Sequence, residues 1–230
     1  MARRISQGAL REFLNCVPEP LHAQVVSRVI DIRRAKGRTL VEKDSRSTDV
    51  YFLVEGSAEV IVYSYNGREV YVHTIGEGDV FGEIAALDGK PRSASVIAIA
   101  ELRAIEMHGE DFMACLKSSP AAGIWVARRL ALGVRRLTDR LFELNALNVQ
   151  TRIHCELLRL AESGKPCSEG VEVRPMPTHA ELAKRIGTHR EAVSREISAL
   201  SKSNLIRHDR RKMVIIDLER LRRGAAAGAR

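Results

Sequence analysis

The sequence has few of the residues that build disulfide-linked or metal-binding proteins. Its four cysteines stand far apart, with no Cys-x-x-Cys pair and no histidine at ligand spacing: Cys16, Cys115, Cys155 and Cys167. Neither a disulfide framework nor a zinc site fits this pattern. We therefore expect reduced thiols and no bound metal.

Long apolar runs are also missing. No stretch approaches the roughly 18 consecutive apolar residues of a membrane helix, and no apolar signal-peptide segment follows the first four residues. We expect a cytoplasmic protein that does not enter the membrane.

Negative charge is scarce at one end of the chain. Lys and Arg number 37 against 29 Asp and Glu, a net charge of +8. Residues 149–230 carry +7 of this excess and residues 1–148 only +1. Such a basic segment favours an anionic polymer as partner.

The first half of the chain alternates short β-branched segments with turn residues. After helix-like spacing at residues 7–14 and 21–29, the expected strands are Asp49–Val54, Ala58–Tyr63, Glu69–Ile75, Ser95–Ala100 and Leu102–Met107. Asn66-Gly67 is a strong hairpin signal. Period-two alternation with frequent turns predicts an antiparallel barrel or jelly roll.

Residues 81–96 combine glycines, a carboxylate and an arginine in one short loop. Gly82 allows backbone conformations closed to other residues, and Arg92 offers a rigid fork of donors for phosphate oxygens beside the Ser93 hydroxyl. A carboxylate repels phosphate, so Glu83 indicates a ligand that also has hydroxyl groups. The loop predicts a sugar-phosphate site; alternatively, Glu83 and Arg92 pair with each other on the surface.

A long helix without internal proline is expected over residues 121–147. Its apolar positions alternate steps of four and three, as in the seam of a coiled coil: Leu130, Val134, Leu137, Leu141 and Leu144. This favours a parallel homodimer. The alternative is a helix that packs on its own domain. A hinge at Asn148-Val149 and a helix over residues 150–161 follow.

Two Thr-x-x-Glu sequences begin ten residues apart, at Thr178 and Thr188, and predict two helix starts with capping boxes. Ala183, Gly187, Val193 and Ile197 have the spacing of a helix-turn-helix. The second helix exposes three groups suited to reading bases on one face: Arg190, Glu191 and Arg195.

Two strands are expected after this second helix, at residues 205–206 and 213–216, and a basic turn separates them. Arg210, Arg211 and Lys212 in this turn either contact backbone phosphate or form a solvated charge run. Residues 222–230 have too little apolar surface to fold, and we expect no structure there.

These motifs, in this order, resemble the cyclic AMP receptor protein family of bacterial transcription regulators. The resemblance covers nearly the whole chain and rests on FGE followed by PRSA, the long helix and the helix-turn-helix. It implies an α+β fold: a β jelly-roll cyclic-nucleotide-binding domain (1–120), a dimerisation helix and hinge (121–148) and a winged helix-turn-helix domain (149–230). An iron-sulfur centre, as in one oxygen-sensing branch, is not expected from Cys16 alone.

The resemblance also implies roles for individual residues. Glu83 binds the ribose 2′-hydroxyl and Arg92 and Ser93 bind the cyclic phosphate, while the turn is lined by Gly82, Ile84 and Ala85. Val72 either faces the ligand or packs in the core. Aligning from residues 151–153 gives the base-contacting hydroxyl to Thr138, whereas aligning from residues 127–130 selects Val134.

For DNA, the resemblance implies TGTGA-like half-sites in an inverted repeat. Arg190, Glu191 and Arg195 read bases, whereas Thr188 and His189 contact phosphates or cap the helix. The implied function is transcription regulation by cAMP or cGMP acting allosterically on a homodimer, with RNA polymerase as a further partner.

Two other functions are alternatives to this one. The first keeps the architecture but replaces the cyclic nucleotide with a haem ligand, redox signal or metabolite. The second is an enzyme with Glu83 as general base; the absence of a metal-ligand cluster or nucleophile-base pair in the sequence argues against catalysis.

Overall fold

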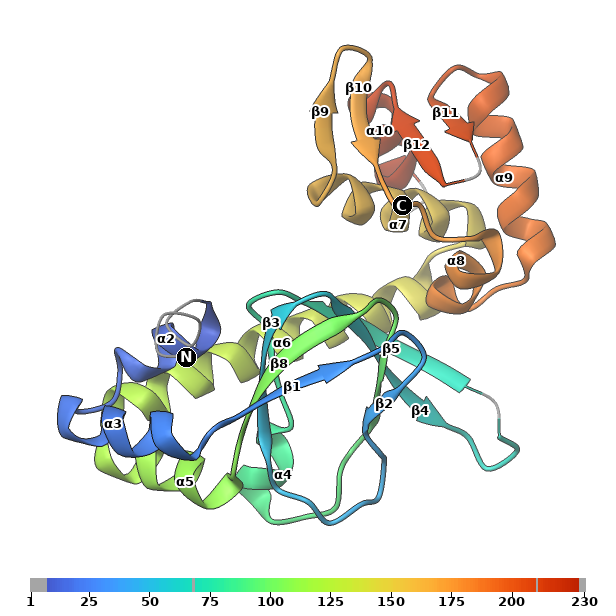
Figure 1. The fold of residues 1–230 in the computed structure, drawn as a ribbon. Helices are drawn as coiled ribbons and strands as arrows, with labels where there is room; N and C mark the ends of the chain where they lie inside the picture. The colour runs from blue at the N-terminus through green and yellow to red at the C-terminus, as the bar shows by residue number, and fades with distance from the viewer. Residues whose placement is uncertain (1–7, 68, 210, 228–230) are drawn as a thin grey trace. The chain divides into compact units, whose positions relative to one another are not determined.

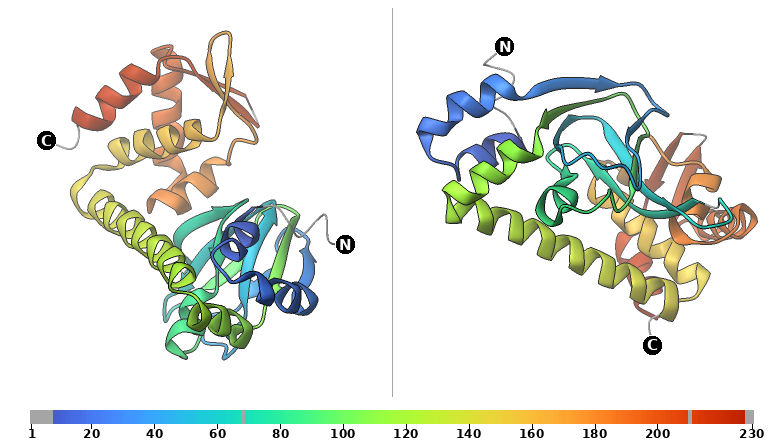
Figure 2. Two further views of the ribbon diagram at one scale, coloured as in Figure 1. Left: turned by 90° about the vertical axis from the view of Figure 1, so that its left-hand side faces the viewer. Right: turned by 90° about the horizontal axis from the view of Figure 1, so that it is seen from below.

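The computed structural model describes residues 8–67, 69–209 and 211–227. The chain forms two compact units, Met1–Val134 and Arg135–Arg230. Helix α6 (Pro120–Ala146) contributes to both units as one unbroken helix (Figure 2). The predicted division at residues 120 and 148 stays a prediction.

Two four-stranded antiparallel sheets build the β-roll of the first unit (Figure 1). The strand orders are β1-β8-β3-β6 and β2-β7-β4-β5. The strands are β1 (Ile30–Arg34), β2 (Thr39–Val41), β3 (Val50–Glu55), β4 (Ser57–Tyr63), β5 (Glu69–Gly76), β6 (Val80–Phe81), β7 (Ser95–Ala98) and β8 (Leu102–Met107). This confirms the predicted antiparallel jelly roll.

Strand β3 is buried on both faces, which explains its continuous apolar run. Tyr51 and Leu53 belong to the core between the two sheets, whereas Val50 and Phe52 belong to a second core. That second core is completed by α2 (Ala9–Leu14), α3 (Glu19–Arg28), α5 (Gly109–Ser118) and the start of α6. The helical entry is confirmed from Ala9; Gln7, its predicted start, lies outside the described residues.

The apolar seam of α6 remains largely uncovered within the chain. Val134 is 63%, Leu137 49% and Leu141 63% exposed, whereas Leu130 packs against the helical core of the first unit. The described residues of this chain leave these apolar side chains exposed, and burying them requires a further apolar surface.

The second unit contains a four-stranded sheet and four helices after α6. The sheet order is β11-β12-β10-β9. Its elements are α7 (Val149–Glu162), β9 (Lys165–Cys167), β10 (Gly170–Val173), α8 (His179–Ile186), α9 (Arg190–Lys202), β11 (Ile206–Asp209), β12 (Lys212–Ile215) and α10 (Leu218–Ala227). This confirms the winged helix-turn-helix.

Ion pairs join the last turns of α6 to α7, and α7 in turn to α8, within the second unit. Glu143 accepts hydrogen bonds from Arg140, at 3.2 Å, and from Arg159. Glu156 in turn pairs with Arg159 and, at 3.5 Å, with Arg185. The charges therefore connect both sides of the predicted hinge.

The predicted disorder of residues 222–230 is wrong for residues 222–227, which belong to α10. Leu221 is only 1% exposed, and the α-carbon of Gly224 lies so near the His154 ring that a β-carbon would come within 2.8 Å of it. Tertiary packing on α7 thus compensates for the weak apolar content of the segment. Residues 228–230 lie outside the described residues.

Candidate functional site

The glycine-rich segment leaves the β-roll and immediately forms a short helix. Strand β6 ends at Phe81, Gly82 has a left-handed φ of 88°, and α4 (Glu83–Asp88) follows. Gly89, with φ 67°, ends the helix. The sequence predicts a glycine-rich loop here. In the structure, six residues of that loop form helix α4, and a glycine flanks the helix at each end.

Arg92 is buried in the wall of the β-roll and is only 2% exposed. Its Nε and Nη2 donate to Ser47 Oγ at 3.1 and 2.9 Å, Nη2 also donates to the Asp49 carbonyl at 2.6 Å, and Nη1 donates to the Gly82 carbonyl at 2.7 Å. These bonds satisfy a charge that would be costly to bury alone. They hold the guanidinium in one orientation.

The backbone of Arg92 is fixed as firmly as its side chain. Asp44 N–H donates to the Arg92 carbonyl at 2.9 Å, and Arg92 N–H donates to the Ser45 carbonyl at 2.9 Å. The segment that joins β2 to β3 and the segment that joins α4 to β7 therefore form one rigid wall.

Burial shifts the pKa values of Arg92 and Tyr51 in opposite directions. It lowers the pKa of Arg92, which the neighbouring Tyr51, Asp49 and Glu83 oppose. It raises the pKa of Tyr51 to about 12, with Glu106 and Asp49 adding to the shift. The Tyr51 ring lies 5.9 Å from the guanidinium carbon and stacks on Phe81 at 4.9 Å.

Glu83 opens α4 and is half-buried. Burial raises its pKa above the ordinary value, while Arg92 and Arg129 lower it. Among the described residues, the ion pairs include none between Glu83 and Arg92, so the alternative of a surface pair is not found. The carboxylate and the guanidinium stand near each other without neutralising each other directly.

The remaining predicted ligand residues occupy different environments. Ser93 and Ile84 are exposed, Ala85 is buried, and Val72 is half-buried against the core between the sheets. Thr138 lies on the part of α6 that belongs to the second unit. Its role stays a prediction, as does that of Val134.

Helix α9, the predicted DNA-reading helix, presents the three predicted side chains on its exposed face. Arg190, Glu191 and Arg195 are exposed, whereas the opposite face is buried through Val193, Ile197 and Leu200. Apolar contacts therefore hold α9 in place while leaving its first two turns accessible to a partner.

Only one of the two predicted capping boxes forms. Thr178 and Glu181 cap α8 reciprocally, as predicted. Helix α9 instead begins after His189, whose side chain makes no capping bond. Thr188 N–H donates to the Ala183 carbonyl at 2.9 Å, so this residue belongs to the C-terminal turn of α8.

Histidine packing behind the reading helix was missed from the sequence. His179 Nδ1 lies 2.8 Å from Ser194 Oγ on α9, and its ring lies 5.3 Å from that of His208 on β11. Burial, His208 and Arg190 lower the pKa of His179. Nothing local marks this contact, since its members are 15 and 29 positions apart.

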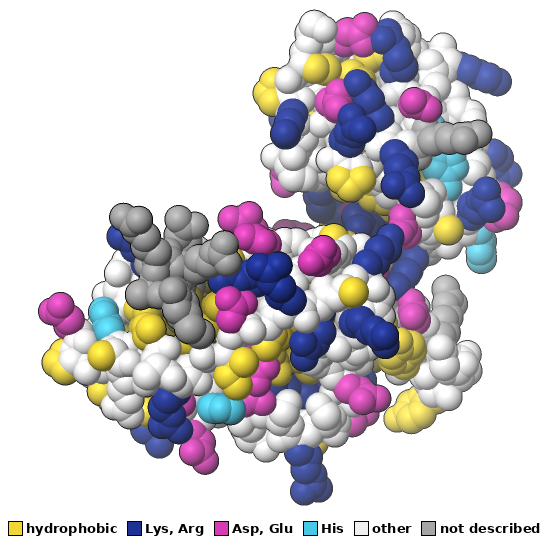
Figure 3. All heavy atoms as spheres, viewed as in Figure 1, with side chains coloured by type: hydrophobic (Ala, Val, Ile, Leu, Met, Phe, Trp, Pro, Cys, Tyr) yellow, Lys and Arg dark blue, Asp and Glu magenta, His cyan; other side chains and the backbone are white. Residues whose placement is uncertain are grey.

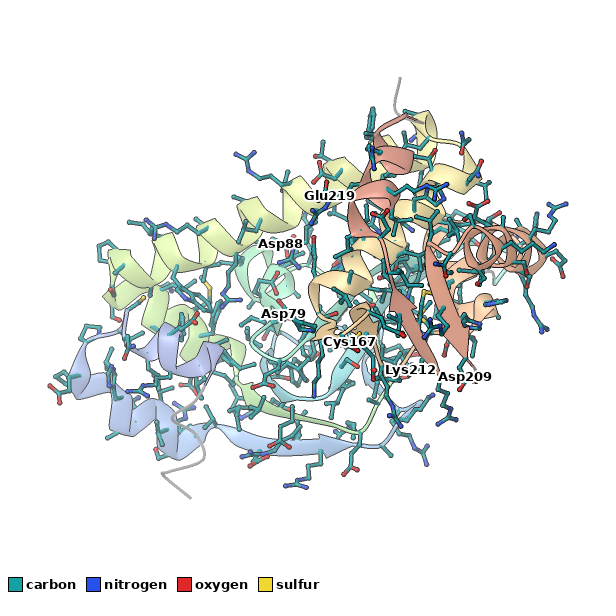
Figure 4. The ribbon with its side chains drawn as sticks, turned by 90° about the horizontal axis from the view of Figure 1, so that it is seen from above. Asp79, Asp88, Cys167, Asp209, Lys212 and Glu219 are labelled. Carbon is teal, nitrogen blue, oxygen red and sulfur yellow. The ribbon has the colours of Figure 1, made fainter. Side chains whose placement is uncertain are left out.

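The wing consists of β11, β12 and the turn between them, and two of its cations form ion pairs. Asp209 and Lys212 face each other in the β11–β12 pairing and are labelled in Figure 4. Lys212 pairs with Glu172 at 2.6 Å, and Arg207 pairs with Glu169. Arg210 lies outside the described residues. Figure 3 shows Lys and Arg interspersed with Asp and Glu over the visible face of this unit.

Two features are absent from the described ranges. They contain no cluster of three or more His, Cys, Asp or Glu side chains suited to a metal ion. They also contain no helix that is both long and apolar enough to span a membrane.

Two family models match the two halves of this architecture. The cyclic nucleotide-binding domain matches residues 32–119, and the Crp-like helix-turn-helix domain matches residues 151–224. The first contains the Glu83 and Arg92 wall, and the second contains the reading helix.

The chain belongs to the cyclic AMP receptor protein family of transcription regulators.

Relatives of this family align over most of the chain. The CRP-like cAMP-activated global transcriptional regulator of Mycobacterium tuberculosis is 28% identical, over 83% of this chain and 85% of the relative. The cyclic AMP receptor protein of Thermus thermophilus is 29% identical, over 75% and 77%. A crystal structure of a CRP-family transcriptional regulator from the same organism covers 86% of this chain and 98% of its own, with 27% identity and a TM-score of 0.72.

Membership of the cyclic AMP receptor protein family makes this chain a DNA-binding transcription regulator with a cyclic-nucleotide-binding domain. The family consists of transcription regulators rather than enzymes.

The fit of Gly82 against Arg92 gives a first prediction. A β-carbon at Gly82 would come within 2.6 Å of the Asp49 carbonyl and 2.7 Å of Arg92 Nη1, whereas one at Gly89 would meet nothing within 4 Å. Both glycines have positive φ, so their backbone strain is similar. Gly82→Ala should therefore lower the free energy of unfolding by about 1 to 3 kcal/mol more than Gly89→Ala.

Urea unfolding of the two variants measures this difference. Equal losses would mean that Arg92 and the Asp49 carbonyl do not constrain the turn.

Proposed function

We propose that this protein is a homodimeric regulator whose DNA binding is controlled allosterically by cAMP or cGMP. The observation that carries the proposal is the buried Arg92 guanidinium, held beside the half-buried Glu83 in the β-roll wall. A buried arginine fork suits a phosphate, and an adjacent carboxylate suits ribose hydroxyls. A cyclic nucleotide has both groups.

In this proposal, the ligand binds at the wall of the β-roll in the first unit. Arg92 and Ser93 bind the cyclic phosphate, Glu83 accepts from the ribose 2′-hydroxyl, and Gly82, Ile84 and Ala85 shape the turn around them. Val72 supplies an apolar contact, and Thr138 contacts the base. A hydroxyl both donates and accepts, so adenine and guanine each remain compatible with Thr138.

Control of DNA binding requires that the nucleotide favour one conformation. A ligand shifts the population only by the difference between its affinities for the two states. We place that difference in the contacts to α6, because α6 contributes to both units and its last turns are joined by an ion pair to α7, which in turn pairs with α8.

A second copy of the chain is the proposed partner of the α6 seam. The exposed apolar positions alternate in steps of four and three, which matches another helix of the same kind. A two-fold dimer presents two copies of α9, and it therefore reads an inverted repeat. Arg190, Glu191 and Arg195 read TGTGA-like half-sites, while Thr188 and His189 contact phosphates. RNA polymerase is the proposed protein partner on the promoter.

Calorimetric titration with cAMP and with cGMP tests the effector. At least one nucleotide should bind and should tighten or weaken binding to a TGTGA inverted repeat at fixed salt. Arg92→Ala should weaken nucleotide binding at least tenfold, since a charged hydrogen-bonding partner of the phosphate is lost.

Two further variants separate this loss from unfolding. Arg92→Lys keeps the charge but removes the fork, and it should weaken binding without unfolding the domain. Lys90→Ala removes an exposed cation two positions away and should bind nucleotide normally. A DNA response that survives in Arg92→Ala would refute the assigned pocket.

Arg195 gives a prediction about sequence reading. Arg195→Ala should cost about 1 to 3 kcal/mol at one base pair of each half-site and relax the preference there. Competition binding with single-base operator variants measures it. Lys202→Ala, at the far end of the same helix, is the control and should leave base preference unchanged. A loss that is equal on every sequence would contradict base reading by Arg195.

Leu141 and Leu132 test the dimer seam. The two leucines are 63% and 53% exposed, and their nine-residue separation places them on opposite sides of α6. Leu141→Glu should weaken dimerisation at least tenfold in sedimentation equilibrium, because a charge would be buried in the seam. Leu132→Glu should leave the dimer intact. A dimer that tolerates Leu141→Glu but not Leu132→Glu would place the interface on the other face.

A further inference from the structure

Ser47 lies on the edge of the Arg92 guanidinium that is best suited to an oxyanion. Arg92 Nε and Nη2 both donate to Ser47 Oγ, at 3.1 and 2.9 Å. These two parallel N–H groups are one of the forks with which arginine grips carboxylate and phosphate oxygens. The serine oxygen thus stands where a phosphate oxygen would be bound.

Few other donors on Arg92 are available. An arginine has five side-chain N–H groups, and four of those on Arg92 already donate to Ser47, Asp49 and Gly82. The single remaining N–H, on Nη1, cannot make a two-bond contact by itself. A phosphate that takes two bonds from this arginine must therefore displace one of the present acceptors.

Ser47 is the acceptor that moves most readily. The Asp49 and Gly82 acceptors are main-chain carbonyls, and Gly82 is fixed between β6 and α4. Ser47 is exposed, and its hydroxyl leaves the guanidinium by rotation about one side-chain bond. The backbone bonds of Asp44 and Ser45 to Arg92 remain in place during such a rotation.

We infer that Ser47 sets the effector affinity of the site by occupying the phosphate-binding edge of Arg92 in the unliganded protein. The inference rests on the proposed cyclic-nucleotide function. Without ligand, the neutral hydroxyl satisfies a buried cation and orients it. The negatively charged phosphate forms stronger bonds with the same N–H pair and takes its place. Each binding event therefore includes the loss of two hydrogen bonds to Ser47.

Removal of the Ser47 hydroxyl tests the inference by calorimetric titration with cAMP and cGMP. Ser47→Ala has no acceptor to displace and should bind the effector about three- to tenfold more tightly than the wild type. Ser47→Thr retains the hydroxyl and should bind like the wild type. Ser45→Ala is the matched control, because Ser45 Oγ donates to the Glu42 carbonyl in the same segment and does not contact the guanidinium.

The titrations of the wild type and Ser47→Ala distinguish the inference about Ser47 from the proposed function. Tighter binding by Ser47→Ala alone, or binding by Ser47→Ala where the wild type binds neither nucleotide, supports the inference. Equal or weaker binding by Ser47→Ala, with clear binding by the wild type, overturns it and leaves the proposed function standing. If neither protein binds either nucleotide, both proposals fail.

Discussion

The burial of one arginine constrains the ligand-binding half of the molecule. A guanidinium does not lose its proton at any physiological pH, so Arg92 requires compensating acceptors once it is 2% exposed. Those acceptors come from the segment before β3 and from the turn after β6. Satisfying this charge brings residues 47–49 together with Gly82 and Arg92, and it holds the guanidinium in one orientation.

The second constraint is the pattern on α6. Its first turns pack into the helical core of the first unit, while its last turns are tied by the Glu143–Arg159 ion pair to α7. The seam between these attachments stays exposed. Helix α6 thus contributes to both compact units and also carries this apolar stripe.

Local patterns in the sequence predicted most elements. Short β-branched segments separated by turn residues predicted β3, β4, β5, β7 and β8, and the Thr178 capping box predicted the start of α8. The failures came where tertiary contacts outweighed local signals. Thr188 has the same capping sequence as Thr178, but its N–H completes the turn after α8, so α9 begins one residue later. Leu221 and Gly224 make too weak a pattern alone, yet packing on α7 stabilises α10.

Short contiguous motifs in the sequence specify which chemical groups are present: Glu83, Arg92 and their glycines in one segment, and the exposed charged side chains of α9 in another. The contacts that hold these groups in place come from tertiary structure. Ser47 precedes Arg92 by 45 positions and Asp49 precedes it by 43. No periodicity or propensity links these residues. Their contact arises because two β-roll segments meet side by side, and the need to satisfy a buried charge selects which oxygens face it.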